Sequence, residues 1–195
     1  MERVIDSQSD GDPAAFLAFD VLQARLAAAP RAPADIGRVR LLVTRHRGGV
    51  RETQQRVAMS ADSGMRGDSW GRQRNPAPEA QLAVMQFDVA SLIANGQPLT
   101  LFGDQLFLEL DLSEANLPAG SVLRAGTATL EVTPMPHNGC RKFRARFGEG
   151  ALRFVSSGEL RHLNLRGIYL RVIEAGEIAV DDEIHVLRRP KQLTY

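Results

Sequence analysis

Short stretches of alternating apolar and polar residues dominate the chain from Gly37 onward, and they constrain the fold more than any other feature. A period of two places one set of side chains on one face, as in a half-buried β-strand. The stretches are 38–43, 127–132, 168–173 and 184–186, with further candidates at Gln81–Phe87 and Gln105–Leu110. Few helical segments separate them, so a parallel α/β fold is not expected. Frequent Gly and Pro between the stretches favours a mainly β fold, a closed or partly closed barrel.

Helices are expected at three places around this barrel. Asp12-Pro13 is typical of a helix start, and the apolar residues from Phe16 to Leu26 predict an appended N-terminal helix. Asp88 is expected to cap a helix at Val89–Ala94, and another helix should begin at Cys140. The domain prediction is a polar tip and helix at 1–35, a barrel at 36–190 and a short tail at 191–195.

One turn is expected between the last strands. Ala175-Gly176 lies between Ile173 and Ile178, and this spacing is typical of a hairpin.

Ser60–Pro78 is the longest polar, Gly-rich stretch, and loops of that length are usually functional or mobile.

The composition excludes several classes of protein. The 195 residues are 44% hydrophobic and 24% charged, as in an ordinary globular domain, and they include one cysteine, too few for an internal disulfide. No apolar run approaches the roughly 20 residues that span a bilayer, so no membrane association is expected. The start, MERVIDSQSD, does not resemble a secretory signal, and the cytoplasm is the expected location.

The cations are almost all arginine and are unevenly distributed. Lys142 and Lys191 are the only lysines, and the stretches Arg38–Arg74 and Arg141–Arg171 each carry an excess of six positive charges. Arginine binds planar anions in a bidentate manner, so the two stretches could together form one site for an anionic ligand. The alternative is a solvated surface with scattered ion pairs. The net charge of +1 argues against nucleic-acid binding.

The lone cysteine is the strongest candidate for chemistry. Cys140 follows two prolines and should lie where a helix begins, beside Arg141, Lys142 and Arg144 and three residues after His137. Helix-terminal N–H groups and nearby cations favour a thiolate, the form that attacks electrophiles or binds soft metals. A buried cysteine acting as a small apolar residue is the alternative. His46, His162 and His185 lack metal-ligand spacing.

Several segments, in order along the chain, resemble the MOSC domain, a family named after the C-terminal domain of molybdenum cofactor sulfurases. Gly64-Met65-Arg66-Gly67-Asp68-Ser69-Trp70 is similar to its Gly-x-x-Gly-Asp-x-Trp loop, and the resemblance extends from about Gly37 to Arg188. Its other segments are Gly103–Leu106, Asp111–Pro118, Gly120–Gly126, Pro136–Phe143 and Gly167–Val172.

This resemblance implies a β-barrel that binds the molybdenum cofactor. Cys140 matches the cysteine that ligates molybdenum in relatives and is the implied metal ligand and catalytic residue. The other implied cofactor-binding residues are Arg66, Asp68, Trp70, His137, Arg141 and Lys142, with Asp68 and Trp70 shaping the loop. No pyridoxal phosphate is expected, because the desulfurase domain of the sulfurases has no counterpart here.

Three functions follow from the resemblance. The first is a molybdenum-dependent oxidoreductase that reduces small N-hydroxylated or related N–O substrates with electrons from a redox partner. The second is a sulfur carrier, in which Cys140 accepts a persulfide sulfur from a separate cysteine desulfurase. The third is a non-catalytic ligand-binding barrel, since a fold by itself does not determine function.

Overall fold

The structure, a computed structural model, describes residues 5–6 and 10–190, so the tail predicted at 191–195 lies outside the described residues. Seven described strands close into a barrel, as the alternation predicts. Their order is β2 (Ile36–Arg45), β12 (Glu183–Arg188), β8 (Val122–Ala125), β9 (Ala128–Val132), β10 (Ile168–Glu174), β6 (Leu82–Gln86) and β7 (Leu106–Glu109), with β7 pairing back to β2. Neighbours are antiparallel except β6 and β7, which run parallel.

Two smaller groups of strands extend this barrel. β3 (Val50–Gln54) pairs with the far end of β2 and with β1 (Ile5–Asp6). A separate three-stranded sheet has the order β11 (Gly176–Ala179), β4 (Arg56–Ser60) and β5 (Gly64–Met65).

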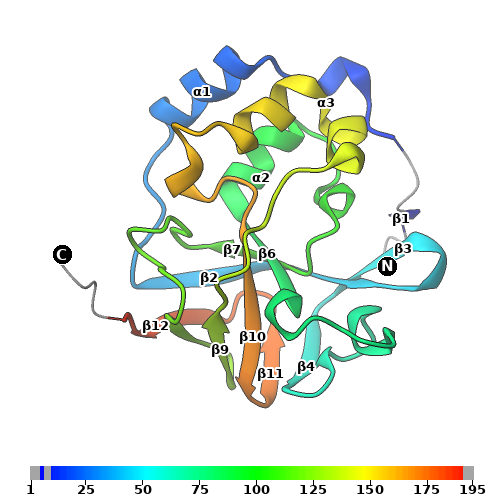
Figure 1. Cartoon of the computed structure of the whole chain (residues 1–195), viewed down its shortest axis with the longest axis vertical. Coiled ribbons are helices and arrows are strands. Elements are labelled where there is room, and N and C mark those ends of the chain that lie inside the picture. The colour runs from blue at the N-terminus through cyan, green and yellow to red at the C-terminus, as the bar shows by residue number, and fades with distance from the viewer. Residues whose placement is uncertain (1–4, 7–9, 191–195) are drawn as a thin grey trace.

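The helices gather on one side of the barrel, above the strands in Figure 1. They are α1 (Phe19–Ala28), α2 (Phe87–Ala94) and α3 (Arg141–Ser156), which contact one another. Short 3₁₀ turns complete the chain: η1 (Pro13–Ala15), η2 (Arg47–Gly49), η3 (Trp70–Arg72), η4 (Pro78–Ala80), η5 (Leu99–Phe102) and η6 (Arg161–Leu163).

The apolar core has two parts, and they explain why strand β2 departs from simple alternation. Val39 and Leu42 belong to the cluster formed by the barrel strands, whereas Val43 belongs to the cluster beneath the helices. The pairing of β2 with β7 shifts register between Val39 and Leu41, which changes the face of the residues that follow. Both faces of this strand are therefore buried, and the expectation of one inward face is wrong there.

Two predicted helix starts need correction. Asp12 caps η1, where its Oδ1 accepts from Ala14 N at 2.9 Å, and α1 begins only at Phe19 after an extended Ala18. Asp88 lies inside the first turn of α2, whose N-cap is Gln86. Its Oδ2 accepts from Gln86 Nε2 at 3.2 Å. α1 is positioned by packing on α2 and α3, and α2 by packing on β6 and β7. In both cases this packing outweighs the local capping signal.

The expected hairpin at Ala175-Gly176 is also wrong. β10 pairs with β9 and β6, whereas β11 pairs with β4 in the other sheet. A register shift between Val172 and Glu174 turns the chain at the end of β10. Gly176 then passes so close to the β8–β9 turn that a Cβ would lie 2.5 Å from the backbone of Thr127. The chain changes sheet here, and only glycine fits.

Candidate functional site

Cys140 lies at the start of a helix, as the sequence predicts. It is the N-cap of α3, with extended backbone angles, and its carbonyl accepts from Arg144 N at 3.0 Å. The residue is exposed, which rules out the alternative of a buried apolar cysteine. α3 bends at Gly148, where φ is +85° and Phe16 packs against the backbone. A solvent-accessible thiol therefore sits at the N-terminal end of this helix.

Four arginines converge beside this helix on one short turn. Arg51 donates to the carbonyl of Thr100, Arg146 to Leu101 at 2.9 Å, Arg166 to Phe102 at 3.5 Å and Arg45 to Gly103 at 3.4 Å. Four consecutive carbonyls of η5 and its C-cap thus each accept from a different guanidinium. We call these residues the arginine cluster: Arg45, Arg51, Arg146 and Arg166.

The guanidinium groups lie close to one another. A Cβ on Gly103 would come 2.7 Å from Arg51 Nη2 and 3.9 Å from Arg146 Nη1. Burial and, to a smaller extent, the charge of Arg146 together lower the pKa of Arg51 to about 10. Burial also lowers the pKa of Arg146, while the thiolate charge of Cys140 acts in the opposite direction. The thiol is therefore within electrostatic reach of the cluster.

A buried carboxylate balances part of this charge. Both oxygens of Asp104 accept from Arg166 Nη1, at 3.1 and 2.9 Å, and Asp104 is fully buried. The Arg166 guanidinium also lies 5.3 Å from the ring centre of Phe143 in the first turns of α3. This ion pair ties the loop after η5 to the chain before β10 and to the helix that carries the thiol.

His137 also lies against Asp104. Its Nδ1 lies 3.5 Å from Asp104 Oδ1, and its ring packs on Tyr169 with centres 4.4 Å apart. Burial lowers the pKa of His137 to about 3, and the charge of Arg166 contributes to the shift. Burial raises the pKa of Tyr169. The imidazole is therefore neutral at physiological pH, and Nδ1 has no hydrogen-bond partner.

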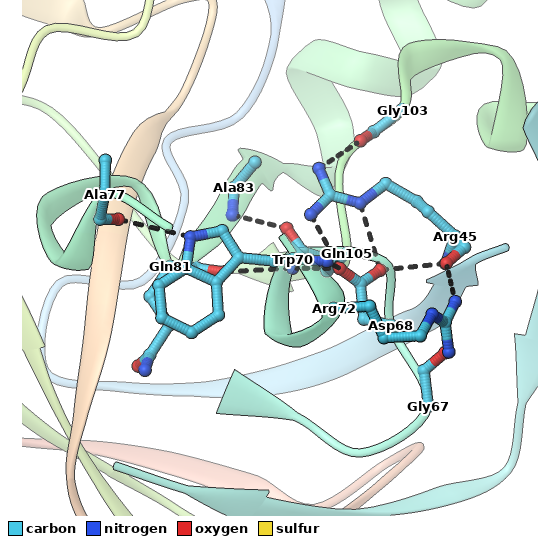
Figure 2. A network of polar contacts seen from close by, with 10 residues as sticks. All are labelled: Arg45, Gly67, Asp68, Trp70, Arg72, Ala77, Gln81, Ala83, Gly103 and Gln105. Atoms are coloured by element: carbon cyan, nitrogen blue, oxygen red, sulfur yellow. Dashed lines mark hydrogen bonds and ion pairs between the residues drawn. The ribbon is translucent and has the colours of Figure 1, made fainter. Parts of the chain in front are cut away.

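Asp68 and Trp70 lie in a second polar network (Figure 2). Asp68 accepts from Arg45 N, Nε and Nη2 at 2.8, 3.0 and 2.8 Å, and from Trp70 N at 2.8 Å. Gln105 Nε2 donates to Asp68 at 3.3 Å, and Trp70 Nε1 donates to the carbonyl of Ala77 at 3.2 Å. The polar groups of both residues are used within the protein, which agrees with a loop-shaping role.

The loops at Gly64–Trp70 and Pro134–Cys140 meet at the same part of the barrel, as expected if they share a site. Gln105 contacts Asp68 in the first loop, while its chain neighbour Asp104 contacts His137 in the second. The charge of Arg45 also lowers the pKa of His137. The arginine cluster draws two members from Arg38–Arg74 and two from Arg141–Arg171, so the two basic stretches do come together.

The remaining predicted residues are more peripheral. Arg141 and Lys142 are exposed on the first turn of α3, next to Cys140. Arg66 is exposed and lines a cavity of about 350 Å³ together with Thr44, His46 and Arg56. The structure therefore keeps Arg141 and Lys142 next to Cys140 and places His137 against Asp104 and Tyr169, while Arg66 lines a cavity away from these residues.

The sequence did not single out the four cluster arginines, Asp104 or Tyr169. The basic stretches contain many arginines, and only burial separates Arg51, Arg146 and Arg166 from their exposed neighbours. One available signal was Gly103, next to Asp104 within a resembling segment, since glycine is common where the backbone approaches another group closely.

Comparisons with known proteins agree with this architecture. A family model described as the MOSC domain matches residues 77–185. Among solved structures, YiiM from Escherichia coli is 20% identical with a TM-score of 0.54, covering 80% of this chain and 73% of that one. The YuaD protein from Bacillus subtilis is 15% identical with a TM-score of 0.57, covering 78% of this chain and 97% of that one. These similarities establish the fold. A search of the curated proteins found no match.

Proposed function

Since this chain belongs to the MOSC domain family, which is associated with the molybdenum cofactor, we propose that it binds this cofactor with Cys140 as the molybdenum ligand and reduces small N–O substrates. The observation that carries the proposal is the exposed Cys140 thiol at the N-terminus of α3, the helix that also carries Arg146 of the arginine cluster, on which the charge of Cys140 acts. A thiolate is a suitable ligand for a soft metal–sulfur centre.

The residues around the thiol fit an anionic group. In the arginine cluster, the buried carboxylates of Asp68 and Asp104 pair with Arg45 and Arg166, and the charge of Asp10 acts on Arg146. Burial and the positive charge of Arg146 lower the pKa of Arg51, and a bound anion would oppose this shift by stabilising the charged guanidinium. Arginines bind phosphate oxygens strongly, and the cofactor carries one phosphate. Arg51 and Arg146 would hold the phosphate, with Arg141 and Lys142 at the rim.

Each residue then has a separate task. Cys140 provides the sulfur ligand, and the Asp104–Arg166 ion pair fixes the segment that leads to it. Asp68 and Trp70 hold the Ser60–Pro78 loop against Arg45. When bound, the cofactor supplies a two-electron redox centre, and a redox partner supplies the electrons.

The expected location of this chemistry is the cytoplasm. No helix in the described part of the chain is long and apolar enough to cross a membrane.

Metal and pterin analysis tests the proposal. The wild-type chain, expressed in a host that makes the cofactor, is expected to carry molybdenum and pterin in equal amounts. Cys140→Ser should lose the metal and any N–O reductase activity together, because oxygen is a harder donor than sulfur. Arg51→Gln should lower the pterin content with the thiol intact. Arg144→Gln is the matched control, because it removes an exposed charge from the turn of α3 that follows Cys140. This variant should retain both molybdenum and pterin.

The exposure of Cys140 also favours a second candidate, sulfur carriage. A desulfurase persulfide could reach the thiol and transfer its terminal sulfur, leaving a persulfide on Cys140. In that case wild-type protein incubated with a cysteine desulfurase and cysteine becomes heavier by one sulfur atom without holding metal, and Cys140→Ser does not. If the folded wild-type chain carries neither molybdenum nor pterin after cofactor-replete expression, cofactor-dependent N–O reduction is contradicted. Sulfur carriage then remains as the candidate function.

A further inference from the structure

Two Asn-Gly sequences occur in the chain, Asn95-Gly96 and Asn138-Gly139. In such a pair the backbone nitrogen of the glycine can attack the side-chain amide carbon of the asparagine, which closes a succinimide ring. Glycine favours this reaction, because it has no Cβ to block the approach and leaves the backbone free to adopt the required angles. The fold determines whether the two groups can meet, and it treats the two sequences differently.

Asn95 is held in place by both ends of its side-chain amide. Its Oδ1 accepts from Arg25 Nη1 at 3.1 Å, and its Nδ2 donates to the carbonyl of Ala15 at 3.1 Å. Its backbone is the left-handed C-cap of α2, with φ at +46°, and its N–H donates to the carbonyl of Ser91. The side chain can reach the nitrogen of Gly96 only after these hydrogen bonds break.

Asn138 has no such restraint. It is exposed in the irregular segment between β9 and α3, and its side chain makes no hydrogen bond within the described part of the chain. The N–H of Gly139, which carries the attacking nitrogen, also has no acceptor among the described residues. No hydrogen bond therefore has to break before these two groups meet.

The charges that follow Asn138 also favour the reaction. The glycine nitrogen attacks after it has lost its proton, so positive charge nearby stabilises the attacking form. Arg141 and Lys142 lie on the first turn of α3, both exposed, and the N-terminus of this helix adds the positive end of its dipole. No Asp or Glu occurs among positions 132–148. The charge of this part of the chain is therefore positive.

We propose that Asn138 is a site of spontaneous deamidation. The nitrogen of Gly139 forms a bond to Asn138 Cγ, the bond from Cγ to Nδ2 breaks, and Nδ2 leaves as ammonia with the proton that the glycine nitrogen has lost. One water molecule then opens the ring at either carbonyl, which gives aspartate or isoaspartate without any oxidant or reductant. A carboxylate thus replaces a neutral side chain two positions before Cys140. The modification goes beyond the proposed function, because it needs neither the thiol nor the cofactor.

Peptide mapping by mass spectrometry tests this proposal, with Asn95 as the internal control. The full wild-type chain is incubated at mildly alkaline pH and physiological temperature and is then digested, and each deamidated peptide is quantified. Conversion at Asn138 is expected to be at least about 10-fold faster than at Asn95, because Asn95 must first break one charged and one neutral hydrogen bond. In urea, where the fold is lost, the two rates should become similar.

Variants identify the reacting residue. Deamidation lowers the formal net charge of +1 by one unit, so ion exchange separates the acidic product from the unmodified chain. Asn138→Gln should remove this product, because the longer side chain closes a ring far more slowly, whereas Asn95→Gln should retain it. Gly139 is left unchanged, since a Cβ there would lie 2.7 Å from Leu152 Cδ1. Cys140→Ser should deamidate as the wild type does, so failure of the cofactor proposal does not affect this result.

Three outcomes overturn the proposal. Asn138 reacts no faster than Asn95 in the folded chain, the difference between the two sites persists unchanged in urea, or the acidic product persists in Asn138→Gln. The wild-type comparison of the two sites decides the question even if a variant does not fold.

Discussion

Arg166 Nη1 donates to both carboxylate oxygens of Asp104, at 3.1 and 2.9 Å, across 62 positions of the sequence. The pair is buried, and it joins the loop after η5 to the segment before β10. The charges of both partners act on His137, Arg51 and Tyr169. This ion pair is therefore the electrostatic centre around which the candidate site is arranged.

Breaking this pair should be costly. Asp104→Asn leaves Arg166 buried without its carboxylate, and removing one partner of a buried pair typically costs about 3–5 kcal/mol in the free energy of unfolding. Urea denaturation measures the loss. Glu183→Gln, which breaks the exposed pair with Arg38, is the control and should change the free energy by less than about 1 kcal/mol. Equal effects of the two substitutions would contradict the central role of Asp104.

His137 should make stability depend on pH. Its pKa is about 3 in the folded chain and about 6.5 in the unfolded chain, so between these values the unfolded chain binds more protons. The contribution of neutral His137 to the free energy of unfolding is complete above about pH 6.5. It is lost progressively as pH falls toward 3, by at most about 1.4 kcal/mol per pH unit. Urea denaturation between pH 7 and 4.5 should show a shallower loss for His137→Phe than for wild type. His162→Phe, at an exposed position, should follow the wild-type curve.

Asp68 should control the order of the Ser60–Pro78 loop. Its carboxylate accepts from the backbone N–H of Arg45 and of Trp70, and hydrogen bonds to charged groups contribute about 1.5–3 kcal/mol each. In Asp68→Asn, hydrogen–deuterium exchange across 66–73 should accelerate roughly 10- to 100-fold, while the barrel strands stay protected. Asp62→Asn, at an exposed position of the same loop, is the control. Unchanged exchange in Asp68→Asn would show that other contacts hold the loop.

The Cys140 thiol should react in the native protein. It is exposed at the N-cap of α3, so iodoacetamide is expected to modify the folded chain once, and mass spectrometry counts the adduct. Cys140→Ser should gain no mass, since the chain has one cysteine. A thiol that reacts only after denaturation would contradict the exposure and would weaken both proposed uses of the residue.

The sequence alone determined the mainly β fold, because alternation with a period of two depends only on which residues are apolar. It also placed Cys140 at a helix start, since Pro136 and Gly139 end the preceding extended segment locally. Helix starts at Asp12 and Asp88 were misplaced because tertiary packing, of α1 on the other helices and of α2 on β6 and β7, outweighs a cap. The hairpin after β10 was wrong because the pairing partners of a strand are not local.

Only the tertiary structure decided which arginines form the cluster. Arg45, Arg51, Arg146 and Arg166 come from segments up to 121 positions apart, and nothing within their own segments distinguishes them from exposed arginines. Barrel closure brings β2, β3, α3 and the approach to β10 around η5, where four carbonyls accept from four guanidiniums. The same closure buries Asp104 and His137. Burial and charge pairing are properties of neighbours in space, so they depend on the fold and not on sequence spacing.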